Sequence, residues 1–190
     1  MVIRGHDRVM QLLKDATAGK ERIPRGHRNA AYAIAVAPDG SWLAVVGLNP
    51  GVQVWDVATG KQRFVLDGHR TAVYAAAAAP DGSWLATAGG DGTVRIWDAA
   101  TGKQREVLGG HRGVVNAVTI SSDGNWMASG GADCTVRVWE TAHWQAQTLM
   151  RVENAIHTCT WLHGGSLACA GPAGLYVFDF LTWDAPATYP

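Results

Sequence analysis

Short apolar runs separated by tight turns recur along the chain, and their lengths predict β-strands. Within residues 69–108, the run VYAAAAA is followed by Pro-Asp-Gly and the run WLATAG by Gly-Asp-Gly. Proline fixes φ and glycine tolerates positive φ, so both tripeptides predict turns. The segments TVRIW and QREVL then alternate apolar and polar positions, as half-exposed strands do. We therefore expect four short strands that form one antiparallel sheet.

The run of five alanines at 75–79 has a competing interpretation, because alanine is the best helix former. The equivalent stretches AYAIAVA and VNAVTIS carry β-branched residues, and Pro-Asp-Gly ends the run within two turns of a helix. We predict an inner strand whose small side chains suit a crowded axis.

The same features return every 42 residues. The period appears in four series, each in one phase: Gly-His at 26–27, 68–69 and 110–111; Trp-Asp or Trp-Glu at 55–56, 97–98 and 139–140; Trp42, Trp84 and Trp126; and Arg28, Arg70 and Arg112. A period of about 40–45 residues with these markers predicts a propeller array, in which each repeat forms one sheet.

Charge and hydropathy exclude several classes of partner. The formal net charge of the 190 residues is zero and no run of Lys or Arg occurs, so nothing predicts binding to nucleic acid. The longest apolar run, VYAAAAA, is far shorter than the roughly 20 residues of a membrane span. The N-terminus lacks a charged-then-apolar signal pattern. We expect a cytoplasmic protein.

Three cysteines, Cys134, Cys159 and Cys169, show no C-x-x-C spacing. They predict neither a disulfide framework nor a zinc site, and no cofactor is expected. Cys159 and Cys169 are expected to face each other across the last hairpin, as buried thiols rather than a disulfide.

Gly-His, a turn Asp and Trp-Asp at this period resemble the WD-repeat β-propeller family. The resemblance implies an all-β fold, a partial and open propeller of four-stranded antiparallel blades. It also implies a hydrogen-bonded set in each blade. The sets match at His69, Thr87, Asp91 and Trp97, and at His111, Ser129, Asp133 and Trp139; the first full repeat keeps His27 and Trp55.

These sets look like catalytic triads, but we interpret them as structural. A buried imidazole, hydroxyl and indole N–H each need a partner, and the Asp accepts from the His and holds its tautomer. A nucleophile should be exposed to substrate, whereas these residues recur inside every blade.

The first full repeat departs from the pattern, because Val45 replaces the hydroxyl and Asn49 replaces the turn Asp. We expect this blade to be weaker than its neighbours by about 1–3 kcal/mol, the usual cost of an unpaired buried group.

The period also predicts the domain bounds. Shifting the start by two periods places MVIRGHDRVMQLL on LATAGGDGTVRIW, so the chain begins inside a blade. The last unit aligns with Leu167 on Met127 and Phe178 on Trp139, but it lacks Gly-His and the turn Asp. The predicted units are a partial blade at 1–26, full repeats at 27–68, 69–110 and 111–152, a degenerate repeat at 153–180 and a tail at 181–190.

The two lateral faces of such a segment would be open. Either further blades lie upstream in a longer polypeptide, or copies of this chain complete a ring together. The last blade, with RVENA, CTW and GLYVFDF, also resembles the propellers attached to bacterial signalling NTPases of the nucleotide-binding, apoptosis-regulator type.

The resemblance implies partner binding on the face built by the loop after Gly-His. Arg28, Arg70 and Arg112 follow the histidines, and their guanidinium groups suit an acidic peptide or phosphate. Alternatively, duplicated repeats simply share a tolerated surface residue. The TGKQR turns at 59–63 and 101–105 lie on the opposite face, where we expect their Lys and Arg to be solubilising.

We expect a non-catalytic protein–protein interaction scaffold rather than an enzyme. The alternative is the C-terminal sensor or regulatory segment of a larger signalling NTPase or kinase. A metal-dependent hydrolase of propeller type needs Asp, Glu, Asn or His at the axis, and the strands AYAIAVA and VYAAAAA offer none.

Overall fold

The computed structural model describes residues 30–180, which are all-β. No helix occurs within this range, and so none that is long and apolar enough to cross a membrane. The strands are β1 (Ala31–Val36), β2 (Trp42–Gly47), β3 (Val52–Asp56), β4 (Gln62–Leu66), β5 (Val73–Ala78), β6 (Trp84–Gly89), β7 (Val94–Asp98), β8 (Gln104–Leu108), β9 (Val115–Ile120), β10 (Trp126–Gly131), β11 (Thr135–Glu140), β12 (Gln145–Arg151), β13 (Thr158–Trp161), β14 (Ser166–Gly171) and β15 (Gly174–Asp179).

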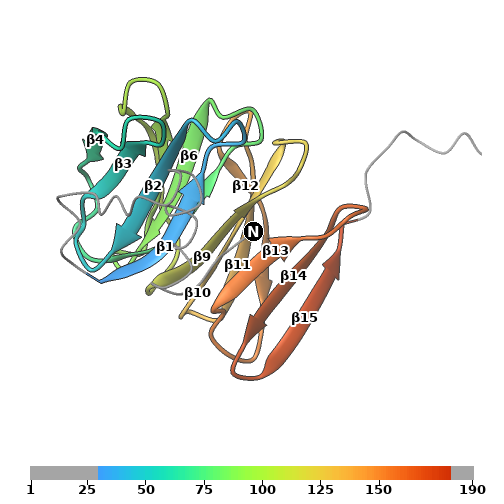
Figure 1. Ribbon diagram of the computed structural model, residues 1–190. Coiled ribbons are helices and arrows are strands. Elements are labelled where there is room, and N and C mark those ends of the chain that lie inside the picture. The colour runs from blue at the N-terminus through green and yellow to red at the C-terminus, as the bar shows by residue number, and fades with distance from the viewer. Residues whose placement is uncertain (1–29, 181–190) are drawn as a thin grey trace, which may run out of the picture.

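The strands form four antiparallel sheets, each built from consecutive strands. Three sheets have four strands and the last has three; we call them blade 1 (β1–β4), blade 2 (β5–β8), blade 3 (β9–β12) and blade 4 (β13–β15). They lie side by side as a fan that does not close into a ring (Figure 1). The predicted open, partial propeller of four-stranded blades is confirmed.

The alanine run forms strand β5, as predicted. Its neighbour β6 pairs with it in antiparallel register, with Ala76 opposite Thr87 and Ala78 opposite Leu85. The Pro-Asp-Gly turn follows directly, and Gly82 adopts a φ of 71°. Propensity for helix is overridden because β5 lies between blades 1 and 3 and contacts the inner strand of each.

The core consists of interfaces between successive blades. Each blade has a trailing face, made by alternate residues of its second and third strands, and in blades 1, 2 and 3 the next blade covers this face. On β2 and β3 the trailing face pairs Ala44 with Val54, and the equivalent pairs are Ala86–Ile96 and Ala128–Val138. These six residues are at most 2% exposed.

The opposite, leading faces of blades 2, 3 and 4 insert larger side chains into the trailing face of the blade before. Val73, Leu85 and Trp97 of blade 2 join the cluster that contains the trailing face of blade 1. The equivalent residues of the next two interfaces are Val115, Met127 and Trp139, and Ile156, Leu167 and Phe178.

Blade 4 keeps this register although its sequence is degenerate. Leu167 pairs with Phe178 as Met127 pairs with Trp139, which is the predicted alignment. Cys159 and Cys169 stand directly opposite each other, both buried and both free thiols. The neighbouring Cys169 thiol and burial together raise the pKa of Cys159 far above its ordinary value.

The arginines of the TGKQR turns make contacts within their blades that the sequence analysis did not predict. The Nε of Arg63 donates to Asp56 at 3.1 Å and its Nη2 donates to the carbonyl of Ser41 at 3.1 Å. Arg105 repeats this with Asp98 at 3.2 Å and the carbonyl of Ser83 at 3.0 Å. Each arginine therefore ties the outer strand of its blade to the closing Trp-Asp.

The predicted partial blade at 1–26, together with His27 and Arg28, lies outside the described residues, as does the tail at 181–190.

Candidate functional site

The polar set of blade 2 is brought together from three strands or their turns. Nδ1 of His69 lies 3.1 Å from both carboxylate oxygens of Asp91, and its Nε2 lies 2.8 Å from Oγ1 of Thr87. The indole N–H of Trp97 donates to the same hydroxyl at 2.8 Å. One tautomer satisfies all of these contacts: Nδ1–H donates to the carboxylate, and the hydroxyl donates to Nε2.

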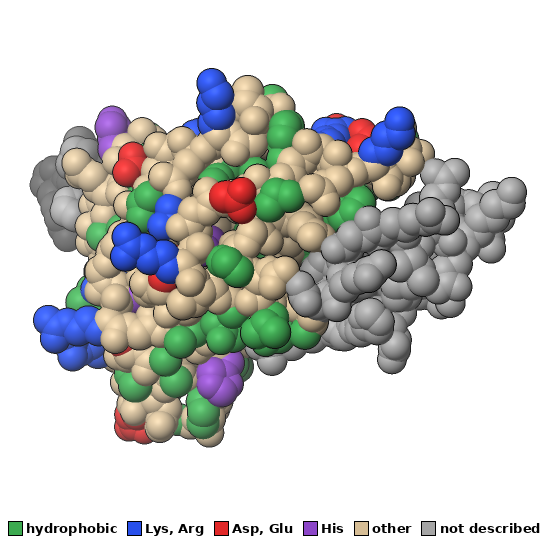
Figure 2. Space-filling view, turned by 90° about the vertical axis from the view of Figure 1, so that its left-hand side faces the viewer, with side chains coloured by type: hydrophobic (Ala, Val, Ile, Leu, Met, Phe, Trp, Pro, Cys, Tyr) green, Lys and Arg blue, Asp and Glu red, His purple; other side chains and the backbone are tan. Residues whose placement is uncertain are grey.

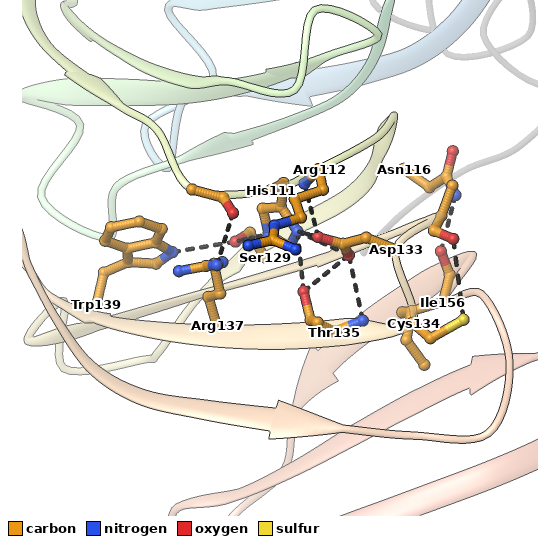
Figure 3. Close-up of polar contacts among 12 residues, drawn as sticks. His111, Arg112, Asn116, Ser129, Asp133, Cys134, Thr135, Arg137, Trp139 and Ile156 are labelled. Atoms are coloured by element: carbon orange, nitrogen blue, oxygen red, sulfur yellow. Dashed lines mark hydrogen bonds and ion pairs between the residues drawn. The ribbon is translucent and has the colours of Figure 1, made fainter.

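Blade 3 repeats the arrangement with serine in place of threonine (Figure 3). His111 lies 3.1 Å from Asp133 and 2.9 Å from Oγ of Ser129, which accepts from the indole of Trp139 at 3.0 Å. The side chains of both histidines are at most 1% exposed. The hydroxyls are buried at 0% exposure, so neither faces a substrate.

Burial sets the charge state of these sets. Burial lowers the pKa of His69 and of His111 below the usual 6.5, and the facing carboxylates only partly offset this. Burial raises the pKa of Asp91, but hydrogen bonds from the Arg70 amide and from Thr93 outweigh it and bring the pKa to about 2. The set thus pairs a neutral imidazole with a carboxylate at neutral pH.

Two further residue types belong to the sets and were not expected from the sequence. The hydroxyls of Thr93 and Thr135 donate to the turn Asp at 2.8 and 2.7 Å. The amides of Arg70 and Arg112 donate to the same carboxylates at 3.0 and 2.9 Å. The threonines recur 42 residues apart, which is the pattern that would have found them.

Blade 1 lacks the hydroxyl, and the structure shows the consequence. The indole Nε1 of Trp55 is buried without a hydrogen-bond partner among residues 30–180. Val45 occupies the place that Thr87 has in blade 2, and it packs in a small cluster with Leu43 and Trp55. Asn49, at the position of the turn Asp, is exposed.

Blade 4 replaces the polar set with apolar groups. By strand register, Cys169 stands where Ser129 does, and Phe178 stands where Trp139 does. The interface between blades 3 and 4 therefore has no hydroxyl–indole hydrogen bond at this position.

The two described arginines of the predicted binding arc, Arg70 and Arg112, are both exposed. Their backbones are held in the same way by the buried carboxylates of Asp91 and Asp133. Because the anchoring is repeated, the two arginines occupy equivalent places one blade apart.

A small recess of about 30 Å³ lies where the inner strands meet. It is lined by the stacked rings of Tyr32 and Tyr74, 5.3 Å apart, and by Asn116 and His157. The amide of Asn116 donates to the carbonyl of Ile156 at 2.9 Å. The space suits no more than about two water molecules, and no cluster of potential metal ligands occurs among residues 30–180.

On the face shown in Figure 2, charges are mixed rather than segregated. On the side where β3 and β4 lie in Figure 1, acidic and basic side chains are scattered between apolar ones (Figure 2). That view contains no broad patch of a single sign.

Comparisons with known proteins agree with this architecture. The family described as "WD domain, G-beta repeat" matches residues 20–56, 60–98 and 102–140, more than half of the chain. The second and third of these repeats run from the outer strand of one blade to the third strand of the next. No curated protein matches the sequence.

Solved structures show the same fold. A structure of U3-55K superposes with a TM-score of 0.76 at 22% identity, covering 83% of this chain and 54% of the other. A crystal structure of RRP9 WD40 repeats gives 0.76 at 23% identity, with 83% and 53% covered. The chain thus spans about half the length of these propellers. The repeat match, the blades and their hydrogen-bonded sets together show that the chain belongs to the WD-repeat family.

Proposed function

We propose that this chain is a non-catalytic protein–protein interaction scaffold that binds an acidic partner through Arg70 and Arg112. WD repeats generally serve as protein-interaction scaffolds, which supports the general role. The observation that carries the specific proposal is the repeated presentation of an exposed arginine whose backbone a buried carboxylate holds. Guanidinium groups carried on backbones held in this way suit bidentate hydrogen bonds to carboxylate or phosphate.

The buried sets support the absence of catalysis at these positions. Their hydroxyls each accept from an indole and lie beside an imidazole nitrogen, so their hydrogen-bonding capacity is used within the blade. We infer that they hold the turn between the second and third strands under the arginines.

The test is binding of a fluorescent Glu-rich peptide, followed by anisotropy at low salt. Arg70→Ala with Arg112→Ala should weaken binding about tenfold or more, because both charge-assisted contacts are lost. Lys61→Ala with Lys103→Ala removes the same charge from exposed positions at the opposite end of the strands and should leave binding unchanged. Equal weakening by both pairs would mean that only net charge matters, and would refute a site at the arginines.

Ring completion is the second part of the proposal. We infer that the chain associates with further blades, either in the same polypeptide or in another copy, because the described blades form an open fan. A role as the sensor segment of a larger signalling NTPase or kinase, a bacterial source and a cytoplasmic location stay predictions from the sequence.

A further inference from the structure

The last hairpin carries two buried thiols on neighbouring strands. Cys159 of β13 stands directly opposite Cys169 of β14, and the two strands lie side by side at the end of the fan (Figure 1). Cys159 is 3% exposed and Cys169 is 1% exposed, and both are free thiols. Neither residue takes part in the proposed binding function.

Backbone hydrogen bonds show which kind of cross-strand pair the two cysteines form. The amide of Leu162 donates to the carbonyl of Ser166 at 2.8 Å, so the pair just inside this bond, Trp161 with Leu167, is a non-hydrogen-bonded pair. The two kinds of pair alternate along antiparallel strands, and the cysteines lie two positions further on. They are therefore a non-hydrogen-bonded pair as well. Such pairs have Cα atoms about 4.5 Å apart, within the range of about 4.4–6.8 Å that disulfides need.

Other blades hold different groups at these two places. By strand register, Cys169 stands where Ser129 does in blade 3, and Cys159 stands where Val118 does. The hydroxyl of Ser129 accepts an indole N–H and so joins the second strand to the third. Blade 4 lacks this hydrogen bond and has two facing sulfurs instead. One covalent bond between them would join its first strand to its second.

A small oxidant can reach one of the two sulfurs. Cys159 and the neighbouring Thr158 line the recess of about 30 Å³ where the inner strands meet, whereas Cys169 does not. The recess suits about two water molecules, and hydrogen peroxide is of that size. Oxidised glutathione is far too large to enter. Peroxide therefore has a route to Cys159 in the folded protein that larger oxidants lack.

We propose that Cys159 and Cys169 are an oxidative modification site, where peroxide that enters the recess forms a disulfide that joins β13 to β14. Peroxide first converts the Cys159 thiol to a sulfenic acid: an S–O bond forms, the O–O bond breaks, and the thiol proton leaves with hydroxide as water. The sulfur of Cys169 then attacks that sulfur. An S–S bond forms, the S–O bond breaks, and a second water carries away the remaining thiol proton. Two thiols are oxidised and one peroxide is reduced.

The chemistry of Cys159 makes this site respond to sustained oxidation. The neighbouring Cys169 thiol and burial raise the pKa of Cys159 far above its ordinary value. Because the thiolate is the reactive form of cysteine, the disulfide should form at neutral pH on the order of hours rather than seconds.

The experiment treats the full chain with hydrogen peroxide in a Cys134→Gly background, which removes the least buried of the three thiols. Glycine suits this place, because Cys134 has a φ of 59° and its equivalent in blade 2 is Gly92. The tryptic peptide 152–190 contains both remaining cysteines and no Lys or Arg. It should lose two hydrogens in mass and should no longer react with an alkylating reagent, until dithiothreitol restores both thiols.

The disulfide should also stabilise the protein. Its formation should raise the melting temperature by about 5 °C or more, because the bond closes the loop between Cys159 and Cys169 in the unfolded chain. Cys159→Val is the matched control, since Val118 has this place in blade 3. Peroxide should leave its melting temperature without any rise; an equal rise would show that oxidation elsewhere is the cause and would overturn the proposal.

Three further results would contradict the proposed site. Peptide 152–190 could gain oxygen atoms without losing hydrogens, which would show that the sulfurs do not combine. The disulfide could form and leave the melting temperature unchanged or lower. Oxidised glutathione at the same concentration should leave both thiols free over the same hours; equal oxidation by the two reagents would exclude the recess as the route.

Discussion

At the scale of single residues, one hydroxyl decides whether a blade's polar set is complete. Thr87 and Ser129 each accept an indole N–H and contact an imidazole nitrogen. Val45 has the same place in blade 1 and the same shape as threonine, but it leaves Nε1 of Trp55 buried with no hydrogen-bond partner in the described part of the chain. The period predicts this defect, because it shows Val45 in the position of Thr87.

Val45→Thr should therefore stabilise the protein. The new hydroxyl gives Trp55 an acceptor without changing the volume of the side chain, and we expect a gain of about 1 kcal/mol in the free energy of unfolding. For a chain of this size the melting temperature should rise by about 2–4 °C. Adding Asn49→Asp restores the turn carboxylate and should raise it further. An unchanged or lower melting temperature in both variants would contradict this account.

The reverse change, Thr87→Val, should cost about 1–3 kcal/mol, because Nε2 of His69 and the indole of Trp97 both lose their partner. Urea unfolding of the single variant measures the loss. Thr87→Ser keeps the hydroxyl and serves as control, as Ser129 does in blade 3; a loss as large as that of Thr87→Val would mean that the methyl group, not the hydrogen bond, is responsible.

At the scale of elements, the fit between blades depends on how small the second strand is. Ala86 and Ala88 in blade 2 correspond to Ala128 and Gly130 in blade 3. A Cβ on Gly130 would lie 2.4 Å from Cγ2 of Ile156 and 3.0 Å from Sγ of Cys159. Glycine is thus required here by space, since a Cβ would overlap the side chain of Ile156.

Gly130→Ala should loosen the interface between blades 3 and 4. Overpacking of this kind typically costs 1–3 kcal/mol, and hydrogen exchange of the β13 and β14 amides should rise more than that of blade 2. Ile156→Ala removes the contacted methyl group, so Gly130→Ala should cost less in that background than in the wild type. Equal cost in the two backgrounds would show that the contact is not the cause.

At the scale of the whole molecule, blades 2 and 3 each contribute to stability through the same pair of charge states, a neutral histidine beside an ionised aspartate. Two neutral histidines and two carboxylates with a pKa of about 2 lie between the strands of blades 2 and 3. Each of these pKa values is below that of the unfolded chain. Lowering the pH therefore reduces the stability of both blades over the same pH range.

The free energy of unfolding should be greatest above pH 6.5 and fall in two stages. Below the ordinary histidine pKa of 6.5 the unfolded chain takes up protons that His69 and His111 do not, so stability declines. Below 3.8 it declines again, as Asp91 and Asp133 are protonated only near pH 2. Urea unfolding from pH 8 to pH 2 measures the profile.

Asp91→Asn with Asp133→Asn should flatten the lower stage. This separates these carboxylates from the half-buried Asp56, whose pKa a hydrogen bond from Arg63 also lowers to about 2. A profile that is level between pH 7 and pH 5 would contradict neutral histidines in the folded state.

The sequence by itself determined the strands, the blades and the His, hydroxyl, Asp and Trp of the polar sets, because these repeat every 42 residues and depend on local spacing. It determined the degenerate last blade as well, since Leu167 and Phe178 align with Met127 and Trp139 once a small deletion is allowed. Tertiary structure alone decided which equivalent side chains are covered. Val138 is buried and Val177 is exposed, although both belong to the same strand of the repeat, because only a following blade distinguishes them. The hydrogen bond from Arg63 to Asp56 could not be predicted from the sequence either. It joins two strands through a long side chain whose direction no local pattern specifies.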